Sequence, residues 1–138
     1  IYLDRRLILG ETLEGVKSEM DILIEGKDAS WEVGTLHHTT WKGKELVYEP
    51  MHNPWIIEPD NVLTQSLIGA YKNIYKEEPS KFDFWDFGTN AITPVALGVP
   101  TIGFGPGEYK LAHMRDEKCA VDRIVEACDV YCELVKEL

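Results

Sequence analysis

The stretch "TIGFGPGEYKLAHMRDEKCAVD", residues 101–122, decides how the rest of the chain is interpreted. It continues an apolar run, "VPTIGF", which is typical of a strand buried on both faces of a parallel sheet. A stiff, narrow turn follows that strand, built from Gly103, Gly105, Pro106 and Gly107. Open α/β sheets bind ligands at the carboxyl ends of their strands, so this turn and His113 beyond it form a candidate site.

The spacing of the glycines argues against a nucleotide site. A dinucleotide fingerprint needs G-x-G-x-x-G opening directly into a helix, whereas this turn reads G-x-G-x-G and the next expected helix begins near residue 122. A phosphate loop would need a Lys-Ser or Lys-Thr pair directly after the glycines, and none follows this turn.

His113 is the histidine of this stretch and a candidate metal ligand. A neutral imidazole held after a rigid turn and near acidic residues coordinates zinc well, although a loop histidine that bonds a carbonyl group or solvent is the plainer interpretation. One histidine cannot hold zinc, which needs three or four ligands. His37 and His38 are adjacent and point to opposite faces of an expected strand, and His52 lies in a linker, so no second cluster at metal spacing is found.

The composition limits the classes of function. The 138 residues correspond to about one average domain, with 44% hydrophobic and 28% charged residues as in ordinary soluble chains. The formal net charge of −10 argues against a nucleic-acid partner, and no apolar run reaches the ~20 residues of a membrane helix. Cys119, Cys128 and Cys132 show no paired disulfide spacing, and the last two are small apolar residues on one expected helix face, which indicates a reducing, cytoplasmic location.

The first part of the chain predicts the order strand, helix, strand, strand. Residues 1–9, "IYLDRRLIL", favour a strand, and residues 12–25 favour a helix capped by Thr12. Alternating residues on both sides of a turn at Lys42–Gly43 predict a hairpin within residues 30–50. This order is most of a ferredoxin-like sandwich whose opening helix and strand are missing.

The second part of the chain follows a linker at residues 51–60 and alternates helices with strands. The expected elements are a helix over residues 60–77, a strand within 81–90 that runs into a loop, a short helical turn over 91–98, a strand at 99–104 and a helix over 122–138. This alternation predicts the α/β class.

Three stretches together resemble one protein family. "GVPTIGFGPGEYKLAHMRDE" resembles the C-terminal motif of the di-zinc aminoacyl hydrolases, a family that includes acetylornithine deacetylase, succinyl-diaminopimelate desuccinylase and carboxypeptidase G. "IYLDRRLILGET" resembles a strand of the family's inserted lid domain, with an Asp-x-Arg followed by a Gly-x-Thr turn. "FGTNA" falls where the family has a Ser/Thr-Asp step, and its Thr-Asn step is similar to that of a subgroup linked to selenium metabolism.

The resemblance implies an architecture of two parts. Residues 1–54 would be part of an inserted ferredoxin-like (α+β) lid and dimerisation domain, and residues 55–138 would be the C-terminal part of a zinc-peptidase-like catalytic α/β domain. The chain begins without methionine inside an expected strand, so we expect a longer protein whose other metal ligands and general base lie before Ile1. We also expect that protein to form a homodimer through its lid.

The resemblance also implies roles for single residues. His113 would be the last ligand of a site with two zinc ions, or cobalt or manganese in their place, and no catalytic residue would lie in this chain. Arg6 would bind a substrate carboxylate through two parallel hydrogen bonds, unless it is a surface arginine of the strand, while Arg5 on the other face would be structural. The remaining substrate-binding residues would be Thr89, Asn90, Gly105 and Gly107, with Asn90 in place of the family's charged Asp.

The implied reaction is hydrolysis of an amide bond in an N-acyl amino acid or small peptide by water that two zinc ions activate. The alternative is a non-catalytic pseudo-hydrolase, or an interaction and dimerisation module that uses the lid surface. The metal ligands expected before Ile1 would distinguish the two, because only the enzyme needs them.

Overall fold

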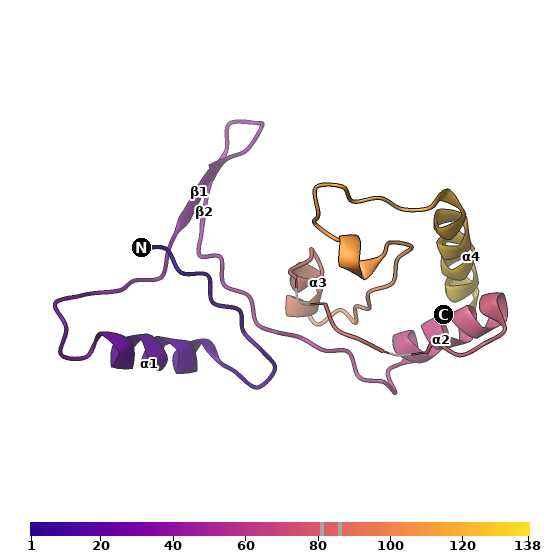
Figure 1. The fold of residues 1–138 in the computed structure, drawn as a ribbon, viewed down its shortest axis with the longest axis horizontal. Helices are drawn as coiled ribbons and strands as arrows, with labels where there is room; N and C mark the ends of the chain where they lie inside the picture. Colours follow the sequence, from indigo (N-terminus) through magenta and orange to yellow (C-terminus); the bar gives the residue numbers. More distant parts are fainter. Residues whose placement is uncertain (81, 86) are drawn as a thin grey trace. The chain divides into compact units, whose positions relative to one another are not determined.

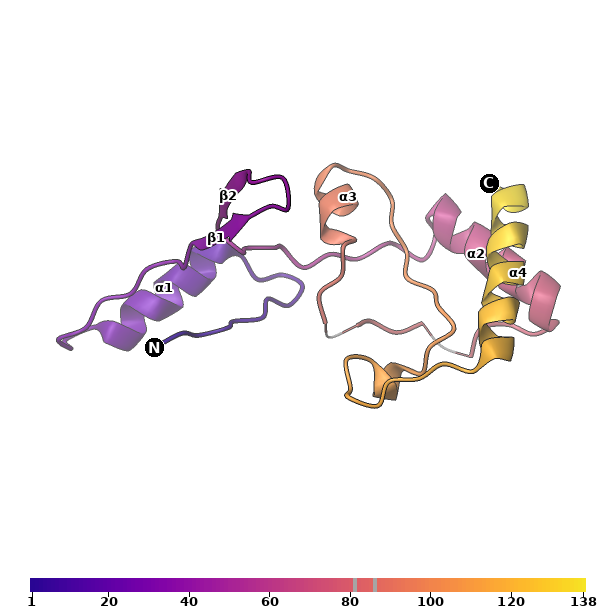
Figure 2. The ribbon, with the colours of Figure 1, turned by 90° about the horizontal axis from the view of Figure 1, so that it is seen from above.

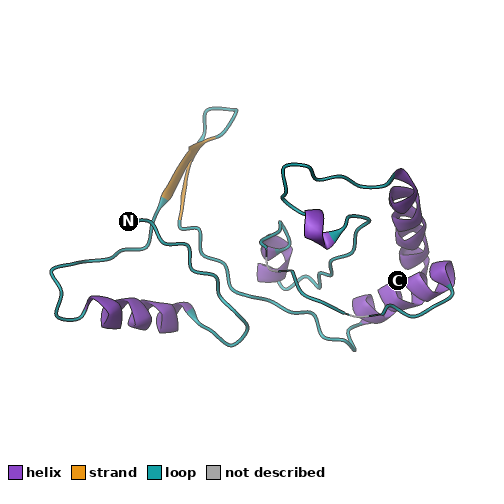
Figure 3. Ribbon diagram, viewed as in Figure 1, coloured by secondary structure: helices purple, strands orange, loops and turns teal. Residues whose placement is uncertain are grey.

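The structure, a computed structural model, describes residues 1–80, 82–85 and 87–138. The chain divides into two compact units, residues 1–56 and residues 57–138 (Figure 1). Helices and an antiparallel strand pair give the described residues a mixed α/β content, with long loops between them (Figure 3). Among these described residues, no helix combines the length and the apolar character needed to cross a membrane.

Helix α1 (Leu13–Ile24) forms in the first unit where the sequence predicts a helix. The Thr12 side chain accepts a hydrogen bond from the Gly15 backbone N–H at 3.1 Å, which satisfies one of the donors left unpaired at a helix start. Just beyond the helix, Gly26 adopts φ +68°, a left-handed conformation that glycine tolerates and that ends the helix. The helix predicted over residues 12–25 is therefore confirmed.

Strands β1 (Leu36–Thr39) and β2 (Glu45–Tyr48) form the predicted hairpin. They pair antiparallel, with His37 opposite Val47. In the turn between them, Gly43 adopts φ +76°, a conformation in which any side chain would be strained. The prediction of a turn with glycine at this position is confirmed.

The strand predicted over residues 1–9 is wrong. In the described chain, residues 1–8 belong to no strand, and residues 9–10 form a turn. A strand forms only where a neighbouring backbone supplies hydrogen bonds, and among the described residues the β1–β2 pair is the full extent of the sheet. The structure therefore shows the expected helix and hairpin in the expected order along the chain. The ferredoxin-like sandwich and the assignment of residues 1–54 to a lid stay predictions.

The second unit is built on two long helices, α2 (Val62–Tyr75) and α4 (Val121–Glu137). The Asn61 side chain caps α2 by accepting a hydrogen bond from the Leu63 N–H at 3.0 Å. Two short elements lie between these helices in the sequence, α3 (Ile92–Ala96) and the 3₁₀ turn η1 (Tyr109–Leu111). The structure confirms the helices predicted over residues 60–77, 91–98 and 122–138.

The core of the second unit lies where α2 and α4 cross in contact (Figure 2). Its buried residues are Leu67, Ala70, Val130 and Leu134. Ile102 and Phe104, from the segment that contains the glycines, pack against this cluster. The Tyr131 hydroxyl on α4 donates a hydrogen bond to the Phe104 carbonyl, so α4 holds this segment by both apolar and polar contacts.

The strands predicted in the second unit are wrong for the residues that the structure describes. Residues 99–104 belong to no strand there, although two of their side chains pack on the helices. Residues 82–85 are also outside any strand, while Lys81 and Asp86 of the predicted stretch lie outside the described residues. A buried parallel strand needs neighbouring strands to pair with, and an apolar run alone does not supply them.

We predict that Val130→Ala lowers the free energy of unfolding of the second unit by about 1–3 kcal/mol, because it leaves a cavity between α2 and α4. Val135→Ala on the same helix is the matched control. Val135 is 74% exposed, so its truncation should change stability by less than about 0.5 kcal/mol. Chemical denaturation followed by circular dichroism measures both effects, and equal effects would contradict the described packing.

Candidate functional site

His113 follows η1 and has an unusual backbone conformation. Its φ is +60°, in the left-handed region that residues other than glycine adopt rarely. The His113 N–H donates a hydrogen bond to Glu117 Oε2 at 3.2 Å. The imidazole of His113 meets the ring of Phe87 at an edge, with 4.8 Å between centroids and 77° between planes. An aromatic contact therefore orients the imidazole, which remains exposed to solvent.

The described part of the chain does not complete a metal site around His113. No group of three or more His, Cys, Asp or Glu side chains within residues 1–80, 82–85 and 87–138 could hold a metal ion. Zinc in a catalytic site takes at least three protein ligands. A role of His113 as one ligand of such a site stays a prediction.

Three aromatic rings lie in a row beside His113, and we call Trp85, Phe87 and Tyr109 the aromatic row. Trp85 stacks on Phe87, with centroids 5.5 Å apart and planes at 17°, and Phe87 stacks on Tyr109 at 5.7 Å and 24°. The sequence motifs did not predict this row. The signal that could have indicated two of its members is the spacing of Trp85 and Phe87, because residues two apart share a face in a strand. Tyr109 comes from η1, and no local pattern connects it to the other two.

Of the three glycines in the turn, Gly103 is the one that the packing of this unit requires. A Cβ added to Gly103 would lie 2.4 Å from Trp85 Cη2, far inside van der Waals contact. A Cβ added to Gly105 or Gly107 would meet no atom within 4 Å, and neither residue has a positive φ. Gly103 therefore supports the aromatic row, and a substrate-binding role for Gly105 and Gly107 stays a prediction.

Thr89 and Asn90 lie just before α3, in a segment that reaches His113. Thr89 Oγ1 accepts a hydrogen bond from the Ala91 N–H at 3.2 Å, so the hydroxyl stabilises the turn into the helix. Phe87, two residues before Thr89, contacts the His113 ring, so the structure brings this segment and the histidine together. The substrate-binding roles of Thr89 and Asn90 stay predictions.

Arg6 and Arg5 belong to the first unit and have different partners. Arg6 Nη2 lies 3.2 Å from Asp4 Oδ2, and both side chains are exposed. Arg5 Nη2 lies 2.6 Å from Glu11 Oε1. The hydrogen bond from Arg5, together with one from the Ile8 N–H, holds the pKa of the Glu11 carboxyl below its usual value. Arg5 thus ties the first segment to the start of α1, which agrees with a structural role.

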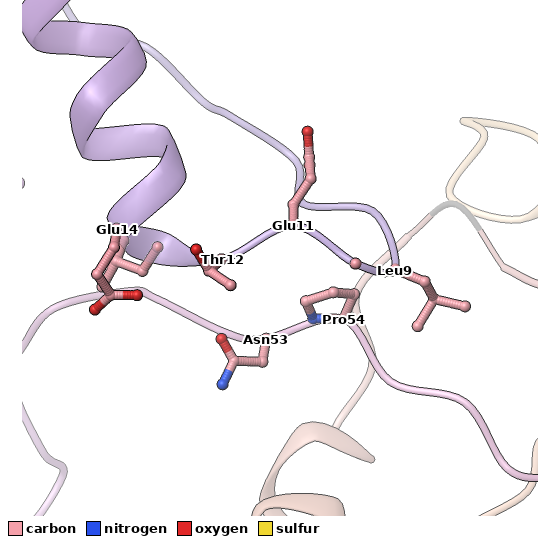
Figure 4. A pocket seen from close by; sticks show the side chains of 8 residues that line it. Leu9, Glu11, Thr12, Glu14, Asn53 and Pro54 are labelled. Carbon is pink, nitrogen blue, oxygen red and sulfur yellow. The ribbon is translucent and has the colours of Figure 1, made fainter.

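An open pocket of about 430 Å³ lies in the first unit, beside the start of α1 (Figure 4). Its lining residues are Leu9, Gly10, Glu11, Thr12, Leu13, Glu14, Asn53 and Pro54. The Thr12 hydroxyl already caps the helix, and the Glu11 carboxylate is paired with Arg5. The pocket contains none of the predicted site residues, although the Gly-x-Thr turn of the quoted lid motif, residues 10–12, lines it.

We predict that Gly103→Ala moves the Trp85 indole, because the new methyl group would overlap the ring. Gly105→Ala is the matched control, since it adds the same group two residues away in open space. The measurement is the wavelength of maximum tryptophan emission, with Trp85→Leu identifying the part of the signal that belongs to Trp85. A shift of equal size in both alanine variants would show that Trp85 does not rest on Gly103.

This chain is similar in sequence to known proteins and to the model of one protein family. Uncharacterized protein YgeY of Escherichia coli is 31% identical over 137 residues, which cover 97% of this chain and 34% of YgeY. Succinyl-diaminopimelate desuccinylase of Corynebacterium glutamicum is 36% identical over 42 residues, which cover 30% of this chain and 11% of that protein. The chain spans about a third of the length of YgeY. No solved structure matches the chain. The profile of peptidase family M20/M25/M40 matches residues 8–137, and the chain therefore belongs to this family.

Proposed function

We propose that a full-length protein containing this chain hydrolyses an amide bond in an N-acyl amino acid or small peptide, using water activated by two zinc ions. Membership of a peptidase family supports a metal-dependent hydrolase. The partial similarity to an enzyme named for removing a succinyl group supports an N-acyl substrate. The observation that carries the proposal is His113, which is exposed after the glycine-containing turn and oriented by Phe87.

The His113 imidazole fits zinc as a single ligand. A neutral imidazole nitrogen is a common zinc ligand, and this ring is exposed. The described residues hold no complete ligand set, so the remaining ligands would come from other parts of the full-length protein. When bound, two metal ions would supply a hydroxide nucleophile and polarise the amide carbonyl.

The other predicted residues would bind and orient the substrate. Arg6 has a planar guanidinium that can bind a carboxylate through two parallel hydrogen bonds, in competition with its ion pair to Asp4. Asn90, beside Thr89, offers an amide that donates and accepts hydrogen bonds without placing a negative charge near the substrate. The open space at Gly105 and Gly107 leaves room for a substrate to approach the backbone.

The alternative is a non-catalytic protein that uses residues 1–54 for interaction or dimerisation. Exposed apolar side chains favour it: Ile22 on α1 is 69% exposed and Val47 on β2 is 59% exposed. The two proposals differ in one observable property of the full-length protein, because the alternative needs no bound metal. A folded full-length protein that binds no zinc would support the alternative.

We predict that His113→Ala in the full-length protein removes at least one bound metal ion and most of the activity, because it deletes a ligand. Arg6→Ala should instead raise KM by about tenfold or more with a smaller change in kcat, since it weakens a charge-assisted contact to substrate. His52→Ala, an exposed linker histidine, is the control and should keep both metal and activity. Metal content per subunit and kinetics with N-acyl amino acids test this, and full activity in His113→Ala would refute the assignment.

A further inference from the structure

His113 occupies a position of a turn that usually takes glycine. The Met114 N–H donates a hydrogen bond to the Leu111 carbonyl at 3.1 Å, which closes a turn over residues 111–114. Ala112 has φ -58° and ψ 131° and His113 has φ +60°, as in a type II turn, whose third residue needs a positive φ. Glycine adopts that conformation freely, whereas the Cβ of a histidine crowds the backbone there. Contacts outside the turn must therefore support the histidine.

The Glu117 carboxylate supplies one such contact. Glu117 Oε2 accepts a hydrogen bond from the His113 backbone N–H at 3.2 Å. The Glu117 N–H in turn donates to the Met114 carbonyl at 3.1 Å, so the residue next to the histidine holds the Glu117 backbone. A hydrogen bond to a charged acceptor is stronger than one between neutral groups. This contact therefore joins the two ends of residues 113–117 and restrains the backbone at His113.

Two different contacts thus act on His113. Glu117 holds its backbone, and the ring of Phe87 meets its imidazole with 4.8 Å between centroids. The ends of the surrounding loop are also joined, because the Cys119 thiol lies 3.5 Å from the Pro106 carbonyl oxygen and donates a hydrogen bond to it. A metal ligand has to be held in one orientation, since metal coordination has preferred distances and angles. Groups that orient a ligand without touching the metal ion therefore belong to a metal site.

We propose that Glu117 is a positioning residue for His113. The Glu117 carboxylate keeps the His113 backbone in its left-handed conformation, and that conformation sets the direction in which the imidazole leaves the chain. This inference rests on the proposed function, because it concerns His113 as a metal ligand. Glu117 itself does not bind the metal ion, and its effect on metal binding passes through the histidine.

The test measures the zinc affinity of the full-length protein by competition with a chelator of known affinity. We expect Glu117→Ala to raise the Kd for zinc about tenfold, because it removes a group that orients a metal ligand. Glu117→Gln keeps an oxygen that accepts the His113 N–H, so its Kd should stay within about threefold of that of the unmodified protein. Asp116→Ala removes the exposed carboxylate next in sequence and is the control for loss of charge, which should change the Kd by less than about threefold.

A double-mutant cycle separates positioning from a direct role. In the His113→Ala background, the residual zinc affinity no longer depends on the direction of an imidazole. We therefore expect Glu117→Ala to change the Kd in that background by less than about twofold. An equal effect of Glu117→Ala in both backgrounds would show that Glu117 acts without His113. A Kd as high in Glu117→Gln as in Glu117→Ala would show that the charge is required, and either result would overturn the proposal.

The zinc content of the unmodified protein distinguishes failure of this inference from failure of the proposed function. A full-length protein that binds no zinc would contradict the proposed function, and this inference with it. A protein that binds zinc through His113 and keeps its zinc affinity in Glu117→Ala would support the proposed function and contradict the positioning role. All variants are compared at a temperature at which circular dichroism shows that they are folded.

Discussion

The contact between α2 and α4 is the constraint on which the rest of the second unit depends. Val130 is fully buried there. The next residue on α4 is Tyr131, whose hydroxyl donates a hydrogen bond to the Phe104 carbonyl. Next to Phe104 in the sequence, the Trp85 indole packs against the backbone of Gly103. Trp85 stacks on Phe87, and Phe87 meets the His113 ring. A continuous series of contacts thus leads from the helix core to the proposed metal ligand.

Local signals predicted the helices and the hairpin because those elements form from contacts between residues close in sequence. Thr12 and Asn61 cap their helices with their own side chains, and Gly26 and Gly43 adopt the backbone conformations that end a helix and close a hairpin. The strands expected at residues 1–9 and 99–104 depend on distant backbone partners. The patterns of these two stretches favoured strands but could not supply a neighbouring backbone, and the described chain pairs neither of them.

The sequence indicated several residues of the candidate site but not the packing around them. The motif around the glycine turn pointed to His113, and two other stretches that resemble the family pointed to Arg6 and to Thr89 and Asn90. The motif did not show that packing requires Gly103 while Gly105 and Gly107 lie in open space. That difference is due to Trp85, which lies eighteen residues before Gly103 in the sequence. The aromatic row was missed for the same reason, since Tyr109 and Phe87 are brought together by the fold and not by any local spacing.

The central proposal is that His113 is one ligand of a metal site whose other ligands the described residues do not supply. Zinc content of the isolated 138-residue chain after dialysis, measured beside a full-length protein that contains it, tests this claim most directly. The account predicts that the full-length protein retains zinc and that the isolated chain retains none in stoichiometric amount, because a zinc hydrolase site takes at least three protein ligands. Stoichiometric zinc in the isolated chain, lost on His113→Ala, would contradict it.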